Sequence, residues 1–355
     1  MTKKISIKDI AQRLNLSTTT VSFVINGKAK EKFISKEVTA KILDLVAEVG
    51  FRPNSFAKGL RTGKSNTIGF LVDHISDPFF SGIAHFLEEI AAQHGYKILF
   101  SSTGKEKNKF TELVDAFTER RVDGYIVATA VGMEEEVKKL VDSEVPVVLF
   151  DRYLPGIPAD YVLVDNFSST YKATQHLFEN GYRNCAFITT DTGEQQMTDR
   201  LEGYRHAVSD HGKAETILKI KYEGNGSTVN IITSFLHANR QIDAVIFAAN
   251  YLTMEGLRAL KSPNRKFRDD LALVSFDDFE LLEFISPAIT AIRQPMEKIA
   301  QHIMKLLLAK FAQKNDEGMF STINIPCVLN IRESSAVKVQ MERPSFRAES
   351  RNLSR

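Results

Sequence analysis

Short apolar runs alternate with longer stretches of helical periodicity from Thr67 to about residue 290, and no other feature of this sequence restricts the fold as strongly. Runs such as TIGFLV, PVVLFD and AVIFAA are apolar at nearly every position, which is typical of strands covered on both faces. The segments between the runs predict crossover helices, for example at 79–94, 106–121, 134–143, 167–180 and 251–261. Strands that alternate with helices in this way predict an α/β fold with parallel sheets.

The alternation falls into two similar series, at roughly 67–160 and 162–290. Each series is long enough for one doubly wound subdomain. A helix at 295–311 and the segments within 320–332 then return the chain. We therefore expect one domain at 67–335 that consists of two doubly wound parallel-sheet subdomains. The polar residues 336–355 predict a flexible tail.

The first fifty residues have the pattern of three short helices. Ser6 precedes an apolar series at helical spacing, and Asp9 stands three residues after Ser6, where it completes a capping pair. Ser17 opens a second helix, and a third helix starts near Ser35. Because a tight turn separates the first two helices, this part of the chain predicts a helix-turn-helix headpiece at 1–50.

The N-terminal part of the chain is also basic. Residues 1–64 hold 13 Lys and Arg against 5 Asp and Glu, whereas the remaining residues hold 33 against 39. A basic module joined to an acidic body favours a polyanionic partner for the module. The basic stretch at 51–66 predicts a linker or hinge, in which Asn54 can cap a short helix that runs to Leu60.

Several classes of protein are disfavoured. The first residues lack the continuous apolar segment of a signal peptide, and the apolar runs are far shorter than the roughly 18 residues that a membrane helix needs. Cys185 and Cys327 cannot form a disulfide framework, and Cys185 lies in an apolar run that predicts a core position. We expect a cytoplasmic protein without a metal or cofactor.

An enzyme is also disfavoured. The segment GLRTGKS at 59–65 looks like a phosphate-binding loop, but its first glycine is one residue too close to GKS, and the segment follows a linker rather than a strand. No HExxH, GxSxG or GxGxxG stands in a suitable context. A solute-binding protein of a transporter remains an alternative class, against which the headpiece and the absence of a signal peptide argue.

Specific sequence motifs identify a family. The segment SIKDIAQRLNLSTTTVSFVIN at 6–26 closely resembles the helix-turn-helix of the LacI/GalR family of bacterial regulators, and FRPNSFAKGLRTGKSNTIGFLV at 51–72 resembles its hinge and first effector-domain strand. The resemblance continues through DPFF, RRVDGYIV, PVVLFDR, DRLEGYR and LVSFDD to about residue 332. It implies a homodimeric repressor that binds operator DNA, is associated with the nucleoid when bound, and carries a periplasmic-binding-protein-like pair of subdomains for a small effector.

The resemblance also implies which residues contact DNA. Thr18, Thr19 and Phe23 occupy base-reading positions, and threonine suits this role because its hydroxyl and methyl groups can both meet base edges. Phe23 departs from the long polar or basic residue of many relatives, and it either contacts a thymine methyl or packs within the headpiece. Leu60 occupies the position of a minor-groove wedge, the alternative being packing on the effector domain. The other expected contacts or supports are Ser6, Ser17, Thr20, Ser22, Asn26 and Asn54.

Candidate ligand-binding residues lie mainly at the ends of expected strands. Asn250 and Asp277 follow strands directly, and ligands of doubly wound folds bind at such carboxyl ends. By resemblance, Arg200 grips the ligand, and its planar fork suits two hydroxyls or a carboxylate. The alternative for Arg200 and for Asp277 is a structural salt bridge. The remaining candidates are Asp77, Phe79, Phe80 and Arg152. The alternative for Phe79 and Phe80 is core packing, and Arg152 either reaches the cleft or forms an interdomain pair.

Two departures from the family limit the identification of the ligand. Tyr251 stands where many relatives have an aspartate, and the chain has no tryptophan to stack on a sugar. A sugar or sugar derivative is the first expectation, and a nucleoside or purine is the second. The sequence leaves open whether the effector induces or co-represses, which operator is bound, and whether the assembly is a dimer or a tetramer.

Overall fold

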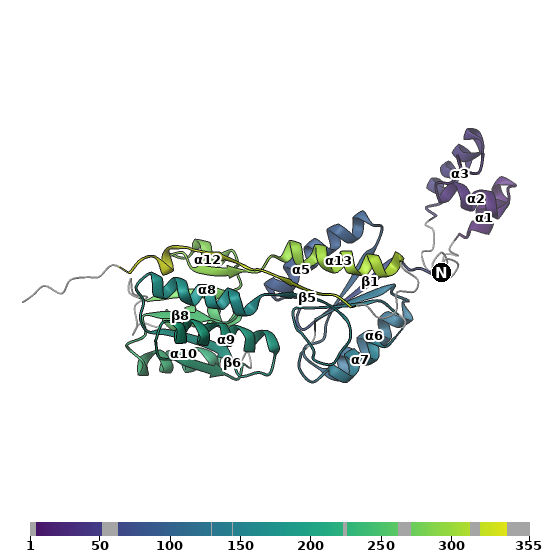
Figure 1. The fold of residues 1–355 in the computed structure, drawn as a ribbon. Helices are drawn as coiled ribbons and strands as arrows, with labels where there is room; N and C mark the ends of the chain where they lie inside the picture. The colour runs from purple at the N-terminus through teal and green to yellow at the C-terminus, as the bar shows by residue number, and fades with distance from the viewer. Residues whose placement is uncertain are drawn as a thin grey trace, which may run out of the picture. The chain divides into compact units, whose positions relative to one another are not determined.

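The computed structural model describes residues 5–51, 63–128, 130–143, 145–222, 226–261, 271–312 and 320–338 (Figure 1). The chain divides into two compact units, Met1–Asn66 and Thr67–Arg355. The predictions for Asn54, for Leu60 and for most of the expected tail lie outside the described residues.

The first unit is a bundle of three helices, α1 (Ile7–Leu14), α2 (Thr18–Ile25) and α3 (Lys36–Glu48). Ser6 and Asp9 form the expected capping box at the start of α1, and Ser17 and Ser35 cap the other two helices. These caps satisfy backbone amides that the first helical turn leaves unpaired. One small core holds the helices together, and its buried members are Ile10, Ala11, Val21, Val24 and Ile42.

The second unit contains two lobes, each built on a six-stranded sheet. The sheet of the first lobe has the order β11-β5-β4-β3-β1-β2, and all its pairs are parallel. The first-lobe strands are β1 (Thr67–Val72), β2 (Lys97–Ser102), β3 (Gly124–Val127), β4 (Val147–Phe150), β5 (Asp160–Val164) and β11 (Thr322–Ile325), and its helices are α5 (Pro78–Gln93), α6 (Lys107–Glu119), α7 (Glu134–Val141) and α13 (Met296–Ala312).

The second lobe repeats this plan with the order β12-β10-β9-β8-β6-β7, in which only the edge strand β12 is antiparallel. Its strands are β6 (Cys185–Thr190), β7 (Ile217–Ile220), β8 (Ala244–Phe247), β9 (Ala272–Phe276), β10 (Thr290–Arg293) and β12 (Val328–Asn330). Its helices are α8 (Asn166–Glu179), α9 (Gln195–Asp210), α10 (Ser227–Ala238), α11 (Asn250–Leu260) and α12 (Leu281–Phe284), and the 3₁₀ turn η1 (Glu333–Ser335) follows β12.

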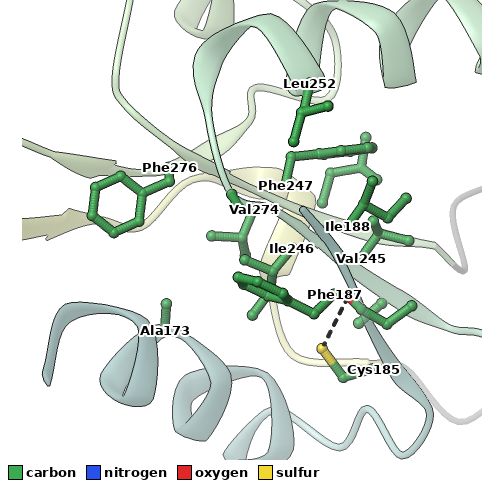
Figure 2. Packing of buried hydrophobic residues seen from close by; sticks show 14 of the residues in the cluster. Ala173, Cys185, Phe187, Ile188, Val245, Ile246, Phe247, Leu252, Val274 and Phe276 are labelled. Atoms are coloured by element: carbon green, nitrogen blue, oxygen red, sulfur yellow. Dashed lines mark hydrogen bonds between the residues drawn. The ribbon is translucent and has the colours of Figure 1, made fainter. Parts of the chain in front are cut away.

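The strands of both lobes are buried as their apolar sequences predict. In the second lobe Phe187, Val245 and Phe247 are fully buried, and their side chains interleave with those of the covering helices (Figure 2). Cys185 lies in the same core with 2% of its surface exposed, so the prediction of a core cysteine is confirmed. Dense packing of this kind makes each lobe a rigid support for the loops at its strand ends.

One boundary drawn from the sequence is wrong. The run YVLVD forms β5, which pairs with β4 and β11 in the first sheet rather than opening the second lobe. The chain therefore passes between the lobes three times, after β5, after β10 and after β11. The membership of a strand in a sheet depends on partners that are far away in sequence, so an apolar run alone does not reveal it.

The two strand orders fix where a ligand can bind. In each lobe the strand order reverses at a central strand pair, which is β1–β3 in the first lobe and β6–β8 in the second. Connections on the two sides of this pair lead toward opposite edges of the sheet. Doubly wound folds have their crevice at the carboxyl ends of such strands. None of the described helices is long and apolar enough to cross a membrane.

Candidate functional site

The start of α2 exposes a run of hydroxyl side chains. Thr18 and Thr19 are exposed, while Val21 and Val24 of the same helix are buried in the headpiece core. Ser17 caps the helix, because its Oγ accepts from the Thr20 backbone N–H at 3.0 Å and lies 2.8 Å from Thr20 Oγ1. The helix therefore presents two unburied threonines at its N-terminal end, the end with which a recognition helix contacts bases.

The rest of α2 is supported by polar contacts within the headpiece. Asn26 Nδ2 donates to the Ser22 carbonyl oxygen at 2.7 Å and lies 3.3 Å from Ser22 Oγ. The ring of Phe23 is partly exposed, and Lys32 Nζ lies 5.5 Å from its centroid. Phe23 is thus paired with a cation at the surface rather than buried in the core.

Ser6 has a complete structural role at the start of α1. Its Oγ and its backbone N–H both donate to Asp9 Oδ2 at 2.7 Å. The hydroxyl also serves as the acceptor for the Asp9 backbone N–H at 3.3 Å. Contact of Ser6 with DNA therefore stays a prediction, as do contacts by the other headpiece residues named above.

Four charged residues from both lobes meet in an ion cluster, which we define as Asp73, Lys105, Arg152 and Glu194. Lys105 is exposed, and the other three are buried. Arg152 Nη2 lies 2.7 Å from Asp73 Oδ2 and 3.5 Å from Glu194 Oε1. Lys105 Nζ lies 3.3 Å from Glu194 Oε1 and 3.7 Å from Asp73 Oδ2. Asp73 and Arg152 follow first-lobe strands, whereas Glu194 precedes α9 of the second lobe, so the cluster joins the two lobes.

Arg200 is held by neutral partners. Its Nε donates to Asn166 Oδ1 at 2.8 Å, and its Nη1 donates to the Ala248 carbonyl oxygen at 2.7 Å. The guanidinium carbon lies 3.5 Å from the centroid of the Phe276 ring, a cation–π contact. Among the described residues, no carboxylate lies within ion-pair distance of Arg200, so its charge is free to meet a ligand.

A second connection between the lobes runs through Asn250. Its Nδ2 donates to Asp77 Oδ1 at 3.0 Å, and its backbone N–H donates to Asp277 Oδ2 at 3.2 Å. Gln294 Nε2 donates to the other oxygen of Asp277 at 2.6 Å. Asp77 also caps α5 by accepting from the Phe79 backbone N–H at 2.9 Å. We call Asp77, Asn250, Asp277 and Gln294 the amide–carboxylate bridge.

The two phenylalanines after Asp77 lie in the core of the first lobe. Phe79 and Phe80 are 7% and 5% exposed, and the Phe80 ring meets Phe150 edge to face at 6.1 Å between centroids. Their packing matches the core interpretation that the sequence left open. The aromatic ring that faces a charged candidate is instead Phe276, against Arg200.

Burial and neighbouring charges shift several pKa values at these strand ends. Burial raises the pKa of Asp151 to about 6, although Arg152 and Arg200 oppose the shift. Burial also raises the pKa of Asp77. Burial disfavours the charge of Arg152, yet the carboxylates of Asp151, Asp73 and Glu194 outweigh it and raise the arginine pKa. Ionisable side chains with shifted pKa values that gather at strand ends are typical of a binding site.

Several of these residues were missed at the sequence level. Asp73 and Gln294 lie just beyond β1 and β10, so the strand-end argument that selects Asp277 could have found them. Lys105 and Glu194 lie in loops and meet only in the folded chain. Asn166 and Phe276 belong to regular elements, and nothing in their spacing marks them as neighbours of Arg200.

A small pocket of about 120 Å³ lies beside the ion cluster. We call it the interlobe pocket, and it is lined by Val131, Glu134, Arg152, Tyr153, Leu154, Pro155, Gly193, Glu194 and Gln195. A larger hollow of about 710 Å³ lies between α5 and α13, and its lining contains none of the predicted ligand residues. We favour the interlobe pocket, because Arg152 and Glu194 of the ion cluster line it. In the described part of the chain, no His, Cys, Asp or Glu group has the arrangement of a metal site.

Family models match nearly the whole chain. Residues 6–54 match the model described as bacterial regulatory proteins of the lacI family. Residues 65–333 match the model described as periplasmic binding proteins and the sugar binding domain of the LacI family.

Individual relatives are similar over most of their length. The ribose operon repressor of Haemophilus influenzae is 27% identical over 93% of this chain and 98% of the relative. The transcriptional repressor PurR of Vibrio campbellii is 28% identical over 88% of this chain and 93% of the relative. The solved lac repressor dimer, bound to operator and the anti-inducer ONPF, superposes with a TM-score of 0.79 at 19% identity, over 94% of this chain and all of that chain.

Proposed function

Because the chain belongs to the LacI family of bacterial regulatory proteins, we propose that it represses transcription by binding operator DNA through α2, under the control of a small ligand bound between the two lobes. The observation that carries the proposal is that one chain contains both a helix with exposed threonines at its N-terminal end and a separate two-lobed unit. A protein of this kind acts in the cytoplasm on chromosomal DNA, and we propose no catalytic activity.

A homodimer follows from the size of the DNA-reading element. One recognition helix covers only one half-site, so a dimer is needed to read two half-sites one helical turn apart. Sedimentation of the full-length protein at micromolar concentration should show a dimer or a larger even assembly. A stable monomer would contradict the proposal.

The chemistry of the ion cluster favours a neutral, hydroxyl-rich ligand. Asp73 Oδ1 and Arg152 Nη1 are buried, and neither has a hydrogen-bond partner among the described residues. A hydroxyl group can both donate to the carboxylate and accept from the guanidinium. In the ion cluster, Asp73 and Glu194 are balanced by Lys105 and Arg152, so the cluster offers an anion no net attraction. A sugar or a sugar derivative therefore fits better than a sugar phosphate.

A nucleoside or purine is the second candidate, and one observation favours it. The rings of Tyr222 and Tyr251 pack with centroids 4.5 Å apart, and burial together with the Glu194 charge raises the pKa of Tyr251. This places an aromatic pair near the ion cluster, and an aromatic surface suits a planar base. Tyr251 is also the position at which the chain departs from many relatives.

The proposal is tested by selecting bound sequences from random duplexes with purified full-length protein, with and without a panel of sugars and nucleosides. We expect a pseudo-palindrome whose binding changes with one compound. Tighter binding would identify a corepressor, and release would identify an inducer. If no sequence is enriched under any condition, the DNA-binding function is wrong.

The hinge completes the proposal, although Leu60 and Asn54 lie outside the described residues. We propose that Leu60 inserts into the minor groove at the operator centre, as an apolar wedge on a basic segment can do. Leu60→Ala should weaken operator binding and leave ligand affinity unchanged. Equal operator affinity of the variant and the wild type would refute the wedge.

A further inference from the structure

Two tyrosines cover the carboxyl end of β6 in the second lobe. Tyr222 follows β7, and Tyr251 lies in the first turn of α11, which follows β8. In the sheet β6 lies between β7 and β8, so the two rings meet over its carboxyl end. Their centroids are 4.5 Å apart, and their planes are inclined by 35°. Because the crevice of a doubly wound fold lies at the strand pair where the order reverses, here β6–β8, this tyrosine pair covers part of the second-lobe side of the crevice.

Tyr251 is held in place next to predicted ligand residues. Its backbone N–H donates to Asn250 Oδ1 at 2.5 Å, and Asn250 belongs to the amide–carboxylate bridge. Arg200 Nη1 donates at 2.7 Å to the carbonyl oxygen of Ala248, three residues before Tyr251. The ring of Tyr251 is partly buried and packs against the second-lobe core. Tyr251 is therefore a fixed part of the wall of the cleft.

The phenol of Tyr251 is within reach of both the ion cluster and Arg200. Burial and the charge of Glu194 raise its pKa, whereas Arg200 and Arg152 oppose the shift. The hydroxyl therefore stays protonated at neutral pH and can both donate and accept a hydrogen bond. Gln196 Oε1 is buried, and it has no hydrogen-bond partner in the described part of the chain. Neutral hydroxyl groups of a ligand suit these surroundings.

The room beside the tyrosine pair is small. The interlobe pocket measures about 120 Å³, well below the roughly 300 Å³ at which pockets for drug-sized ligands begin. A base cannot enter between the two tyrosine rings, because each aromatic contact takes about 3.5 Å and their planes would have to lie about 7 Å apart. A nucleoside needs room for a sugar and a base, whereas a monosaccharide needs room for one ring.

We propose that Tyr251 determines the ligand specificity of the cleft, because its ring closes the space over β6 so that one neutral sugar ring enters and a nucleoside does not. This inference rests on the proposed function and decides between its two candidate ligands. The hydroxyl of Tyr251 contributes a hydrogen bond to the sugar, and the ring excludes the base.

The test is calorimetry of the full-length protein with neutral pentoses and hexoses and with adenosine, inosine and uridine. We expect the wild type to bind at least one monosaccharide and none of the nucleosides at the same concentration. Tyr251→Ala opens the space over β6, so the ratio of monosaccharide to nucleoside affinity should fall by about tenfold or more. Tyr251→Phe keeps the ring, so it should still exclude nucleosides and bind the sugar about fivefold more weakly, the effect of one neutral hydrogen bond.

Two further variants make the test independent of how one variant folds. Tyr251→Asp is also smaller than tyrosine and suits the first turn of a helix, so it should lower the affinity ratio as Tyr251→Ala does. Tyr171→Ala is the matched control, since Tyr171 lies on α8 and its hydroxyl donates to Asp210 at the end of α9 at 2.9 Å. This control should keep the selectivity of the wild type.

Several results would overturn the inference. These are wild-type binding of a nucleoside more tightly than any monosaccharide, binding of no monosaccharide, an unchanged affinity ratio in both Tyr251→Ala and Tyr251→Asp, and nucleoside binding by Tyr251→Phe. A nucleoside that changes operator binding of the wild type would refute this inference and leave the proposed function standing. Failure of the wild type to select any operator would instead refute the proposed function itself.

Discussion

The two candidate sites of this chain are held in place over very different distances along the sequence. In the headpiece, Ser17 pairs with Thr20, and Asn26 pairs with Ser22, so these polar contacts join residues three or four positions apart. In the two-lobed unit, the Asn250 amide reaches Asp77, which is 173 residues away. The first site forms when the three short headpiece helices pack together, whereas the second exists only after both lobes have folded and met.

This difference governs what a substitution can do. Removing a capping side chain affects one helix of a small bundle. The loss of folding free energy is limited to that of a few hydrogen bonds. A lost charge in the ion cluster leaves buried carboxylates without a partner and weakens the link between the lobes. We therefore expect large effects between the lobes and small, local effects in the headpiece.

The largest effect is expected at Arg152. Arg152→Ala leaves the buried carboxylates of Asp73 and Glu194 without their main partner, which should lower the free energy of unfolding by about 3–5 kcal/mol. Chemical denaturation of the two-lobed unit measures this. The matched control is Arg205→Ala, whose ion pairs with Glu202 and Glu215 lie at the surface and should contribute below about 1 kcal/mol. Similar losses of unfolding free energy for both variants would contradict the expected difference between the interlobe and the surface ion pairs.

Arg200 should matter most for the ligand. Arg200→Ala removes the guanidinium that lies over Phe276, and we expect a loss of about 3 kcal/mol in ligand binding, roughly a hundredfold in affinity. Titration calorimetry with the compound found in the selection measures this loss. Operator binding without ligand should be unchanged, because the headpiece contacts are local. The same Arg205→Ala control lies on α9 too, and a variant of Arg200 that still responds to ligand would exclude it from the site.

Asp151 should make the stability of the two-lobed unit depend on pH. Its folded pKa of about 6 lies above the ordinary value of 3.8, so between these values the folded chain keeps a proton that the unfolded chain has lost. The contribution of Asp151 to the free energy of unfolding therefore falls as pH rises from about 4 to 6, by at most about 1.4 kcal/mol per pH unit.

Asp151→Asn tests this expectation, since asparagine also tolerates the φ of 68° at this position. Measured by thermal unfolding, the wild type should lose stability relative to the variant between pH 4 and pH 6, and the difference should level off above pH 7. Asp142→Asn, at an exposed aspartate that follows α7, controls for the substitution. A difference that stays constant with pH would show that the carboxyl titrates normally.

The smallest effect is expected at Ser6. Ser6→Ala removes one half of the capping box of α1 and should cost about 1 kcal/mol of headpiece stability. Circular dichroism melting of the full-length chain can follow the headpiece, and Ser6→Thr should retain the cap. Weaker operator binding by Ser6→Thr with normal melting would show that Ser6 also contacts DNA.

The same contrast explains how far the sequence could predict the molecule. The helix-turn-helix headpiece and the paired parallel sheets follow from caps and apolar periods, which are local signals. The placement of β5 in the first sheet was missed because β4 and β11 decide it, and β11 lies far away in sequence. Among the residues that connect the lobes, Asn250 and Asp277 could be selected because each follows a strand, whereas the meeting of Lys105 with Glu194 depends on the docking of two lobes.

The three passages of the chain between the lobes have a consequence for synthesis on the ribosome. Each sheet receives an edge strand, β11 or β12, from the last described part of the chain, so neither sheet is complete until that part has been made. The headpiece, in contrast, is made before both lobes, and its core contains only its own residues. A nascent chain can therefore carry a folded DNA-reading element well before it can sense a ligand, and the order of translation separates the two abilities in time.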